Sequence, residues 1–347
     1  MFLRTNTSSP SWPDRTMTAL QRQRYRACEK ELTGLPQLPI FDASLTDAEA
    51  ETYFLSSYRY QEEGFHTLHN LKELRVHILQ QLQVEMSLLS PGEHDLMVRA
   101  VMMGGNVPLF NPEFLFFARS LVYRLWGSVT QHRQYRTLTI PVQVSFPALL
   151  SLASDEHRAI REKLDPVFDM VESTLYLMGI LSIEPVIQDM DGLLSGTFAA
   201  GHPNLCRRAL LASFDSVIGM DGKEYLIHPG LADPMTLLDR LHSGAFGPES
   251  LQAEELGEAY ESLMDVEDPL YDRLLSIITP LMRPEHSAEE TIEDILLLIK
   301  QGTTMADLRE VLSSGLVCQI TPEMVEVLEE MIHRIPRWGS LTMGQVQ

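Results

Sequence analysis

The feature that most constrains this fold is the spacing of its apolar residues, which recur every three or four positions over long stretches. Between residues 67 and 89, this spacing places the apolar side chains on one face of an α-helix. The stripe consists of Leu68, Leu71, Ile78, Leu82, Met86 and Leu89. A helix of this kind buries its apolar face against other elements. We therefore expect a mainly α fold, a multi-helix array with a small antiparallel β insertion in the middle third of the chain.

Cap residues and helix breakers indicate where further helices begin and end. The sequence Ser-Pro-Gly-Glu at 90–93 has Ser at the N-cap, Pro in the first turn and Glu three residues after Ser. This is the arrangement of a capping box. We expect a helix from there to Met103, ended by Gly104 and Gly105. The next helix is predicted to begin at Asn111.

An Asp-Pro pair occurs three times, at 165–166, 233–234 and 268–269. An N-cap carboxylate accepts a hydrogen bond from a free backbone amide, and Pro at the first helical position lacks an amide that would need one. We interpret each pair as the start of a helix. The spacings between the pairs are unequal, so they do not indicate a solenoid repeat.

Two segments depart from the helical period. Apolar and polar residues alternate from Leu138 to Phe146, as in a half-buried strand, and Pro141 restricts such a strand to an edge or a bulge. The second segment, 217–227, has an Asp-Gly pair between two apolar runs, which is typical of a β-hairpin. We interpret the two segments as parts of one small sheet.

These patterns divide the chain into four regions. We predict a flexible tail at 1–15, an N-terminal helical region at 16–136, a mixed region with the strand and hairpin at 137–247, and an acidic C-terminal helical bundle at 248–347. The last region has three apolar stripes at helical spacing. They are Ile292, Ile295, Leu296 and Ile299; Met305, Leu308 and Leu312; and Met324, Val327, Leu328, Met331 and Ile335.

The net charge is unevenly distributed. The chain has 27 Lys and Arg against 48 Asp and Glu, a net charge of −21. Residues 1–150 carry 14 basic and 14 acidic side chains, so all of the excess lies in 151–347. Residues 249–347 alone carry 6 basic and 20 acidic side chains, a net charge of −14. Because a phosphate backbone repels such a surface, the charge argues against nucleic-acid binding.

Membrane insertion and export are also not indicated. The longest nearly apolar stretch, Leu175–Ile183, is far shorter than the ~20 residues that cross a bilayer, and the N-terminus lacks the apolar core of a signal peptide. Cys28, Cys206 and Cys318 are odd in number and widely separated, which fits neither a disulfide framework nor a zinc knuckle. We therefore predict a reducing, cytoplasmic location.

Lysine is scarce, since only Lys30, Lys72, Lys163, Lys223 and Lys300 occur among the 27 basic residues. Codon bias in a GC-rich genome accounts for such a preference. Avoidance of ubiquitin acceptors inside a host cell also accounts for it, since Lys is the target of that modification. The second explanation predicts a secreted effector or a viral factor working in host cytoplasm.

One segment resembles a metal-ligand pattern, with Glu63, His66 and His69 as candidate ligands. Glu63 and His66 share a helix face at the i, i+3 spacing found in carboxylate-bridged di-iron bundles. Such a site needs a second Glu-x-x-His, and none occurs here. Three other Glu-His pairs, at 93–94, 156–157 and 285–286, are adjacent residues whose side chains are expected to point apart. Histidines at a helix start are the alternative interpretation, and we predict no cofactor.

A pair of Tyr-x-x-Leu sequences at Tyr260 and Tyr271 resembles an immunoreceptor tyrosine activation motif. The resemblance implies phosphorylation of both tyrosines and binding of tandem SH2 domains. Both tyrosines also fall on the inward faces of two predicted helices, where a kinase does not reach them. The phosphotyrosine-dependent adaptor and the packed helix pair are therefore alternatives.

No familiar catalytic sequence is present, neither Gly-x-Ser-x-Gly, Gly-x-Gly-x-x-Gly nor a Walker loop. We name no catalytic residue and favour a non-enzymatic interaction or regulatory protein. Its partner is predicted to be a protein with a basic surface that docks on the acidic C-terminal part. The candidate partner-binding residues are Glu323, Glu326, Glu329 and Glu330. A helical enzyme with a pocket near the Glu63 segment is the alternative of another class.

Overall fold

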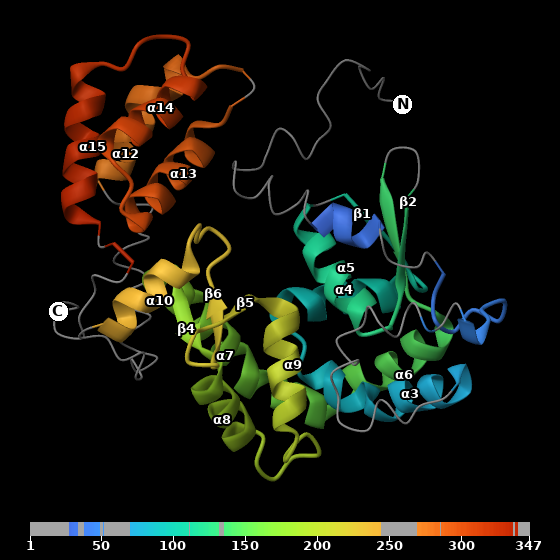
Figure 1. Ribbon diagram of the computed structural model, residues 1–347. Helices are drawn as coiled ribbons and strands as arrows, with labels where there is room; N and C mark the ends of the chain where they lie inside the picture. The colour runs from blue at the N-terminus through green and yellow to red at the C-terminus, as the bar shows by residue number, and fades with distance from the viewer. Residues whose placement is uncertain are drawn as a thin grey trace, which may run out of the picture. The chain divides into compact units, whose positions relative to one another are not determined.

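The protein is mainly α-helical, as predicted (Figure 1). The computed structural model describes residues 28–33, 38–48, 51, 70–110, 112–131, 135–243, 269–284, 286–335 and 337–338. The chain divides into two compact units. Unit 1 consists of Met1–Arg24, Ser173–Ile180 and His228–Gln347, and unit 2 of Tyr25–Glu172 and Leu181–Ile227. No helix within the described residues is both long enough and apolar enough to cross a membrane.

Helices make up most of unit 2. They are α3 (Leu71–Ser87), α4 (Pro91–Met102), α5 (Pro112–Tyr123), α6 (Val142–Leu152), the first part of α7 (Asp155–Met178), α8 (Ile183–Leu193) and α9 (Pro203–Ser213). The capping box that begins α4 is confirmed, because Glu93 Oε2 accepts a hydrogen bond from the Ser90 amide at 2.8 Å and Ser90 Oγ accepts one from the Glu93 amide at 3.5 Å.

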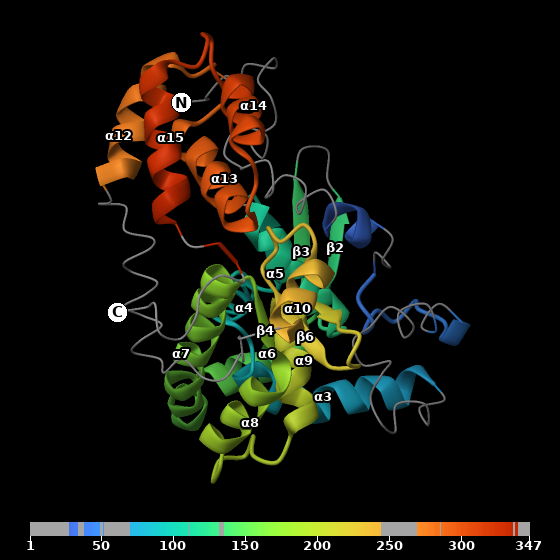
Figure 2. The ribbon, with the colours of Figure 1, turned by 60° about the vertical axis from the view of Figure 1, so that its left-hand side comes forward.

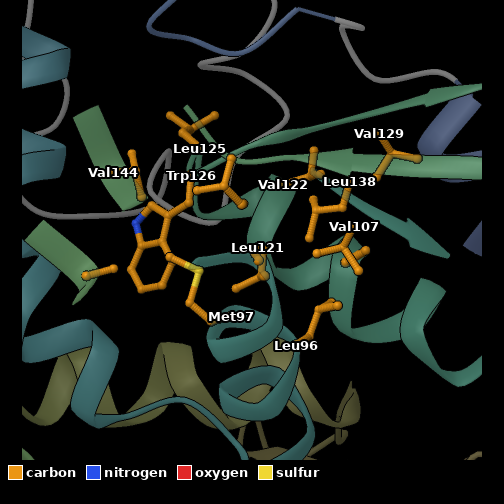
Figure 3. Close-up of a cluster of buried hydrophobic side chains, with 14 of the residues drawn as sticks. Leu96, Met97, Val107, Leu121, Val122, Leu125, Trp126, Val129, Leu138 and Val144 are labelled. Carbon is orange, nitrogen blue, oxygen red and sulfur yellow. The ribbon is translucent and has the colours of Figure 1, made fainter. Parts of the chain in front are cut away.

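The apolar core of unit 2 lies where α3, α4, α5, α6 and the first sheet meet. Figure 3 shows Trp126 among Met97, Leu121 and Val144, and all four side chains are fully buried. Deleting methylene groups from such a close-packed site leaves a cavity, which lowers the free energy of unfolding. Packing at this point therefore fixes the relative positions of α4, α5 and α6.

Two small antiparallel sheets accompany the helices. In the first, β3 (Arg136–Thr139) lies between β1 (Asn106–Leu109) and β2 (Ser128–Gln131), with Leu138 opposite both Val107 and Val129. In the second, the strand order is β4 (Ile180–Ser182), β6 (Glu224–Ile227), β5 (Asp215–Ile218). The β5–β6 pair confirms the predicted hairpin, and Gly222 in its turn has a φ of +76°.

The prediction of a strand from Leu138 to Phe146 is wrong beyond its first residues. The strand ends at Thr139, and α6 begins at Val142 with Pro141 as its N-cap. The apolar run from Val142 onward satisfies both the strand and the helix period, and a proline that fixes φ before the first turn favours the helix. Placing this strand and the hairpin in one sheet is also wrong, because they belong to different sheets.

The prediction that a helix begins at Asp165 and Pro166 is also wrong. Pro166 lies inside α7, and the Asp165 carboxylate pairs with the Arg161 side chain of the same helix. Ile160, Leu164, Val167, Phe168 and Val171 are buried on both sides of Pro166. Burial of both flanks outweighs the missing hydrogen bond and keeps the helix continuous.

The Asp233 start is confirmed, because Asp233 Oδ1 accepts a hydrogen bond from the Thr236 amide at 3.0 Å at the beginning of α10 (Pro234–Ser243). Asp268 lies outside the described residues, although α12 begins at the predicted Pro269.

The C-terminal helices of unit 1 pack around a second apolar core (Figures 1 and 2). They are α12 (Pro269–Ile278), the 3₁₀ turn η4 (Thr279–Leu281), α13 (Ala288–Gln301), α14 (Met305–Gly315) and α15 (Pro322–Arg334). The predicted stripes provide this core, with the following side chains buried: Ile292, Ile295, Ile299, Leu308, Leu312, Met324, Val327, Leu328 and Met331.

A cluster of buried charges joins four segments of unit 2. Arg124, directly after α5, lies 3.7 Å from Glu85 on α3 and 3.8 Å from Glu93 on α4. Arg208 on α9 lies 3.7 Å from the second oxygen of Glu85. Arg124, Glu85 and Glu93 are each 1% exposed. Removing ions from water is unfavourable, so each member of this cluster depends on the charges of the others.

We expect Arg124→Met to lower the free energy of unfolding by ~3–5 kcal/mol, because it removes the cation of the buried Glu93 and leaves Glu85 with Arg208 alone. Urea denaturation of the purified variant measures this change. The matched control is Arg99→Met, which removes the exposed i, i+4 pair with Asp95, and it should change stability by less than ~0.5 kcal/mol. Equal effects of the two variants would contradict the importance of the buried cluster.

Two adjacent glycines after α4 give a second prediction. Both have positive φ, but a Cβ on Gly104 meets nothing within 4 Å, whereas one on Gly105 lies 2.4 Å from the Ile140 carbonyl oxygen. Gly104→Ala should therefore lower the free energy of unfolding by ~1 kcal/mol. Gly105→Ala should lower it by ~3 kcal/mol or more, since the backbone has to shift. Thermal unfolding distinguishes them, and the reverse order would refute this steric account.

Candidate functional site

The structure describes only some of the residues predicted to be functional. Glu63, His66, His69 and Tyr260 lie outside the described residues. Tyr271 lies on α12, half-buried, and packs against the core of the C-terminal helices. Its burial, followed by the charge of Glu293, raises the pKa of its hydroxyl. The four predicted partner-binding residues are exposed on α15: Glu323, Glu326, Glu329 and Glu330.

A pocket of about 420 Å³ opens beside α15, within unit 1. The loop between α13 and α14 forms one wall, and two turns of α15 and the segment that follows it form the other. The lining residues are Gly302, Thr303, Thr304, Met305, Glu329, Ile332, His333 and Arg337. The pocket therefore combines one carboxylate, one guanidinium and one imidazole with two apolar side chains.

Helix caps hold the loop wall of this pocket in place. Gly302 ends α13 with a φ of +82°, and its amide donates to the Ile299 carbonyl at 2.9 Å. Two residues later, Thr304 caps α14, where the Asp307 carboxylate accepts hydrogen bonds from the Thr304 hydroxyl at 2.6 Å and the Thr304 amide at 3.1 Å. These bonds lower the pKa of Asp307. The pocket is thus largely preformed.

The glutamates of α15 lie on one side of the helix, away from the buried face. Arg273 on α12 lies 4.0 Å from Glu323 and 3.5 Å from Glu326, so the charges of these two are partly balanced. Glu329 and Glu330 form no ion pair with any described residue. Glu329 and Glu330 are therefore the glutamates of α15 without a described ion pair, and they lie in the half of the helix that borders the pocket and that also carries His333 and Arg334.

Trp338 and Lys300 support the second wall. The Trp338 amide donates to the Lys300 carbonyl at 2.7 Å, and the Trp338 indole Nε1 donates to the Tyr176 carbonyl at 2.9 Å. The indole packs directly on Gly179, where an added Cβ would lie 2.8 Å from the ring. Because Trp338 follows Arg337, these contacts position Arg337 next to Gly302, at the edge of the pocket.

Lys300 is itself buried, with 2% of its surface exposed. Its Nζ donates to the Tyr176 carbonyl at 2.9 Å and lies 3.3 Å from the centre of the Tyr176 ring. This carbonyl is in the last turn of α7, which has no basic residue of its own, so Lys300 supplies the cation that a helix C-terminus favours. Burial without a carboxylate partner among the described residues lowers the pKa of Lys300 to about 7.

Unit 2 contains a hydrogen-bonded chain of a different kind. Ser87 Oγ lies 3.1 Å from His157 Nδ1, and His157 Nε2 lies 3.2 Å from His94 Nε2. The histidines of two Glu-His pairs, at 93–94 and 156–157, therefore meet, because α4 and α7 bring distant segments together. Within each pair the two side chains do point apart, since Glu93 faces Arg124 in the interior and Glu156 is exposed. Burial, followed by Arg161 for His94 and by His94 for His157, lowers both histidine pKa values to about 4.

The Ser87 chain has a nucleophile-and-base arrangement but no access for a substrate. Ser87 is 0% and His157 2% exposed. A nucleophile must contact the reacting atom, which this burial prevents. Among the described residues, no group of three or more His, Cys, Asp or Glu side chains is placed to hold a metal ion. The pocket beside α15 is therefore the better candidate for a functional site.

The burial of Lys300 leads to a testable prediction about the pH dependence of stability. The unfolded chain binds the Lys300 proton more tightly than the folded one, since the folded pKa is about 7 and the usual value is 10.5. The free energy of unfolding contributed by Lys300 should therefore be lowest below pH 7 and rise from pH 7 to 10.5. In a ¹³C NMR titration of the five lysines, one signal should titrate near pH 7 and be absent from Lys300→Met.

The control for this titration is Lys163→Met, which replaces an exposed lysine and should retain the low signal. If all five lysines titrate together near the ordinary lysine pKa, Lys300 is not buried in the way described.

Comparisons of this chain with protein-family models, with curated proteins and with solved structures found no match. Its function has to be argued from the site itself.

Proposed function

We propose that this chain is a non-enzymatic helical interaction protein that docks a partner protein through the acidic side of α15 and the adjacent pocket. The observation that carries the proposal is the position of Glu329, which lines the pocket and forms no ion pair with any described residue. A cationic side chain of a partner that binds beside Glu329 supplies the ion pair that this carboxylate lacks. The expected partner surface is therefore basic.

The pocket chemistry fits the side chain of arginine or lysine. Both carry a long apolar stem below a charged head. Met305 and Ile332 offer apolar contact to such a stem, and Glu329 offers a carboxylate to the head. Arg337 lines the same pocket and repels a cation, so the head has to bind at Glu329. The capped loop at Gly302–Thr304 is already ordered, so binding requires little further loss of conformational entropy. Glu330, one residue further along the exposed side, extends the acidic surface beyond the pocket.

Charge also supports a basic protein rather than a nucleic acid as partner. Residues 249–347 carry a net charge of −14, from 6 basic and 20 acidic side chains. Such a field accelerates encounter with a basic surface and repels phosphates. We propose a regulatory role in a reducing, cytoplasmic compartment, including host cytoplasm if the protein is an effector.

The test uses a fluorescein-labelled oligoarginine peptide and fluorescence anisotropy with the full chain. We expect Glu329→Gln combined with Glu330→Gln to raise the peptide Kd by about 10-fold, because each surface charge contributes ~0.7 kcal/mol. Raising the salt concentration should weaken binding of the wild-type protein and narrow this difference.

Two matched double variants test whether the effect is local. Glu323→Gln with Glu326→Gln removes the same charge from the same helix, where Arg273 already balances part of it, and should change the Kd less. Glu156→Gln with Glu162→Gln removes two exposed charges of unit 2 and should have little effect. If all three double variants weaken peptide binding equally, the affinity depends on net charge alone and the proposed site is wrong.

A further inference from the structure

Helix α6 has a row of exposed apolar side chains that do not pack into the core of unit 2. The sequence of α6, from Val142 to Leu152, contains no charged residue. Val144 and Ala148 point into the core of unit 2 and are fully buried. On the opposite side, Val142 is 69%, Phe146 59%, Leu149 44% and Leu150 60% exposed. These four lie at i, i+4, i+7 and i+8, which places them in one stripe along the helix.

Two further exposed apolar side chains lie at the end of α4, close to the start of α6. The Ile140 amide donates to the Gly105 carbonyl at 2.7 Å, so the chain after α4 meets the chain before α6. Met102 and Met103, at the end of α4, are 78% and 54% exposed. Figures 1 and 2 show α4 and α6 in the same part of unit 2, and the two helices pack against each other. We call the exposed set the α6 apolar face: Met102, Met103, Val142, Phe146, Leu149 and Leu150.

The α6 apolar face is large enough to form a protein–protein interface. Six large apolar side chains, each about half exposed or more, present on the order of 600 Å² of apolar surface. This equals the largest apolar patches of ordinary monomers, and such patches mark interaction sites. Paired with an equal surface, it gives ~1,200 Å² of buried area, the lower end of specific protein interfaces.

The lack of charge on the α6 apolar face indicates which kind of partner can bind there. None of the six residues is charged, and residues 1–150 as a whole carry 14 basic and 14 acidic side chains. A strongly charged partner therefore finds nothing to pair with on this face. A second copy brings an equally apolar and uncharged surface, and the excess negative charge of the chain lies elsewhere in the sequence, in residues 151–347. Self-association through these six side chains buries no charged group of their own.

We propose that two copies of this chain form a two-fold symmetric dimer through the α6 apolar face. In such an isologous interface the same residues of each copy meet, so one side chain near the axis contacts its own equivalent. Phe146 lies in the middle of the stripe between Val142 and Leu150, and it is the residue placed nearest to the axis. An aromatic ring at the centre of an interface supplies large contact area with few rotamers to order.

Sedimentation equilibrium of the full chain tests the proposal. The wild-type protein is expected to sediment at twice its chain mass of 39.3 kDa and to dissociate on dilution. Phe146→Glu places two like charges against each other at the axis and should raise the dimer dissociation constant by ~100-fold or more. Because Phe146 is exposed, circular dichroism and thermal unfolding should show an unchanged fold.

The matched control is Met220→Glu, which puts the same charge on another exposed apolar residue of unit 2, 84% exposed in the hairpin turn. It should leave the dimer intact. An equimolar mixture of Phe146→Glu and Phe146→Lys should form the mixed dimer, because opposite charges then meet. A monomeric wild-type protein at all concentrations overturns the proposal, since another partner or another part of the chain then covers the face. A Phe146→Glu variant that remains dimeric also overturns it.

Discussion

The buried ion cluster around Arg124 is the interaction on which the arrangement of unit 2 depends. Glu85, Glu93 and Arg208 come from three different helices, and each is stable in the interior only while its counter-charge is present. Glu93 has a second role, because the same carboxylate caps the start of α4. The cluster therefore fixes where α4 begins, and α4 in turn places Gly105 against the start of α6. The position of α6, and of the apolar face proposed on it, therefore depends on this cluster through α4.

Unit 1 buries a cation by a different means. Arg124 faces carboxylates, whereas Lys300 faces the Tyr176 carbonyl and ring. A carbonyl dipole and an aromatic quadrupole stabilise an ammonium less than a full negative charge does, which is why burial lowers the pKa of Lys300 to about 7. The same carbonyl also binds Trp338, so one atom at the end of α7 orders both Lys300 and the segment that closes the pocket.

Local signals were sufficient to predict much of the fold from the sequence. The capping box at Ser90, the hairpin around Gly222 and the stripes of the C-terminal helices each depend on residues within a few turns of one another. The predictions failed where a distant contact decides the outcome, as at Pro166, which packing on both sides keeps inside α7. The His94–His157 contact joins segments 63 residues apart, and no local pattern indicates it. Lys300 stands out in the sequence because it is one of only five lysines and lies at the end of an apolar stripe. Its burial could not be predicted, because it depends on the contact with Tyr176.

The exposed glutamates of α15 were predictable, whereas the pocket beside them was not. Helical spacing alone places Glu329 and Glu330 away from the buried face, but the capped loop and Trp338 create the cavity. Because charge is distributed unevenly along the chain, the two proposed surfaces differ in the partner that they are expected to bind: a second copy for the α6 apolar face, and a basic protein for the acidic side of α15. A dimer joined through an uncharged face carries two acidic faces, one on each copy. Under the two proposals together, a partner with two basic patches that span both faces would gain from effective concentration, which strengthens binding through ion pairs that are individually weak and screened by salt.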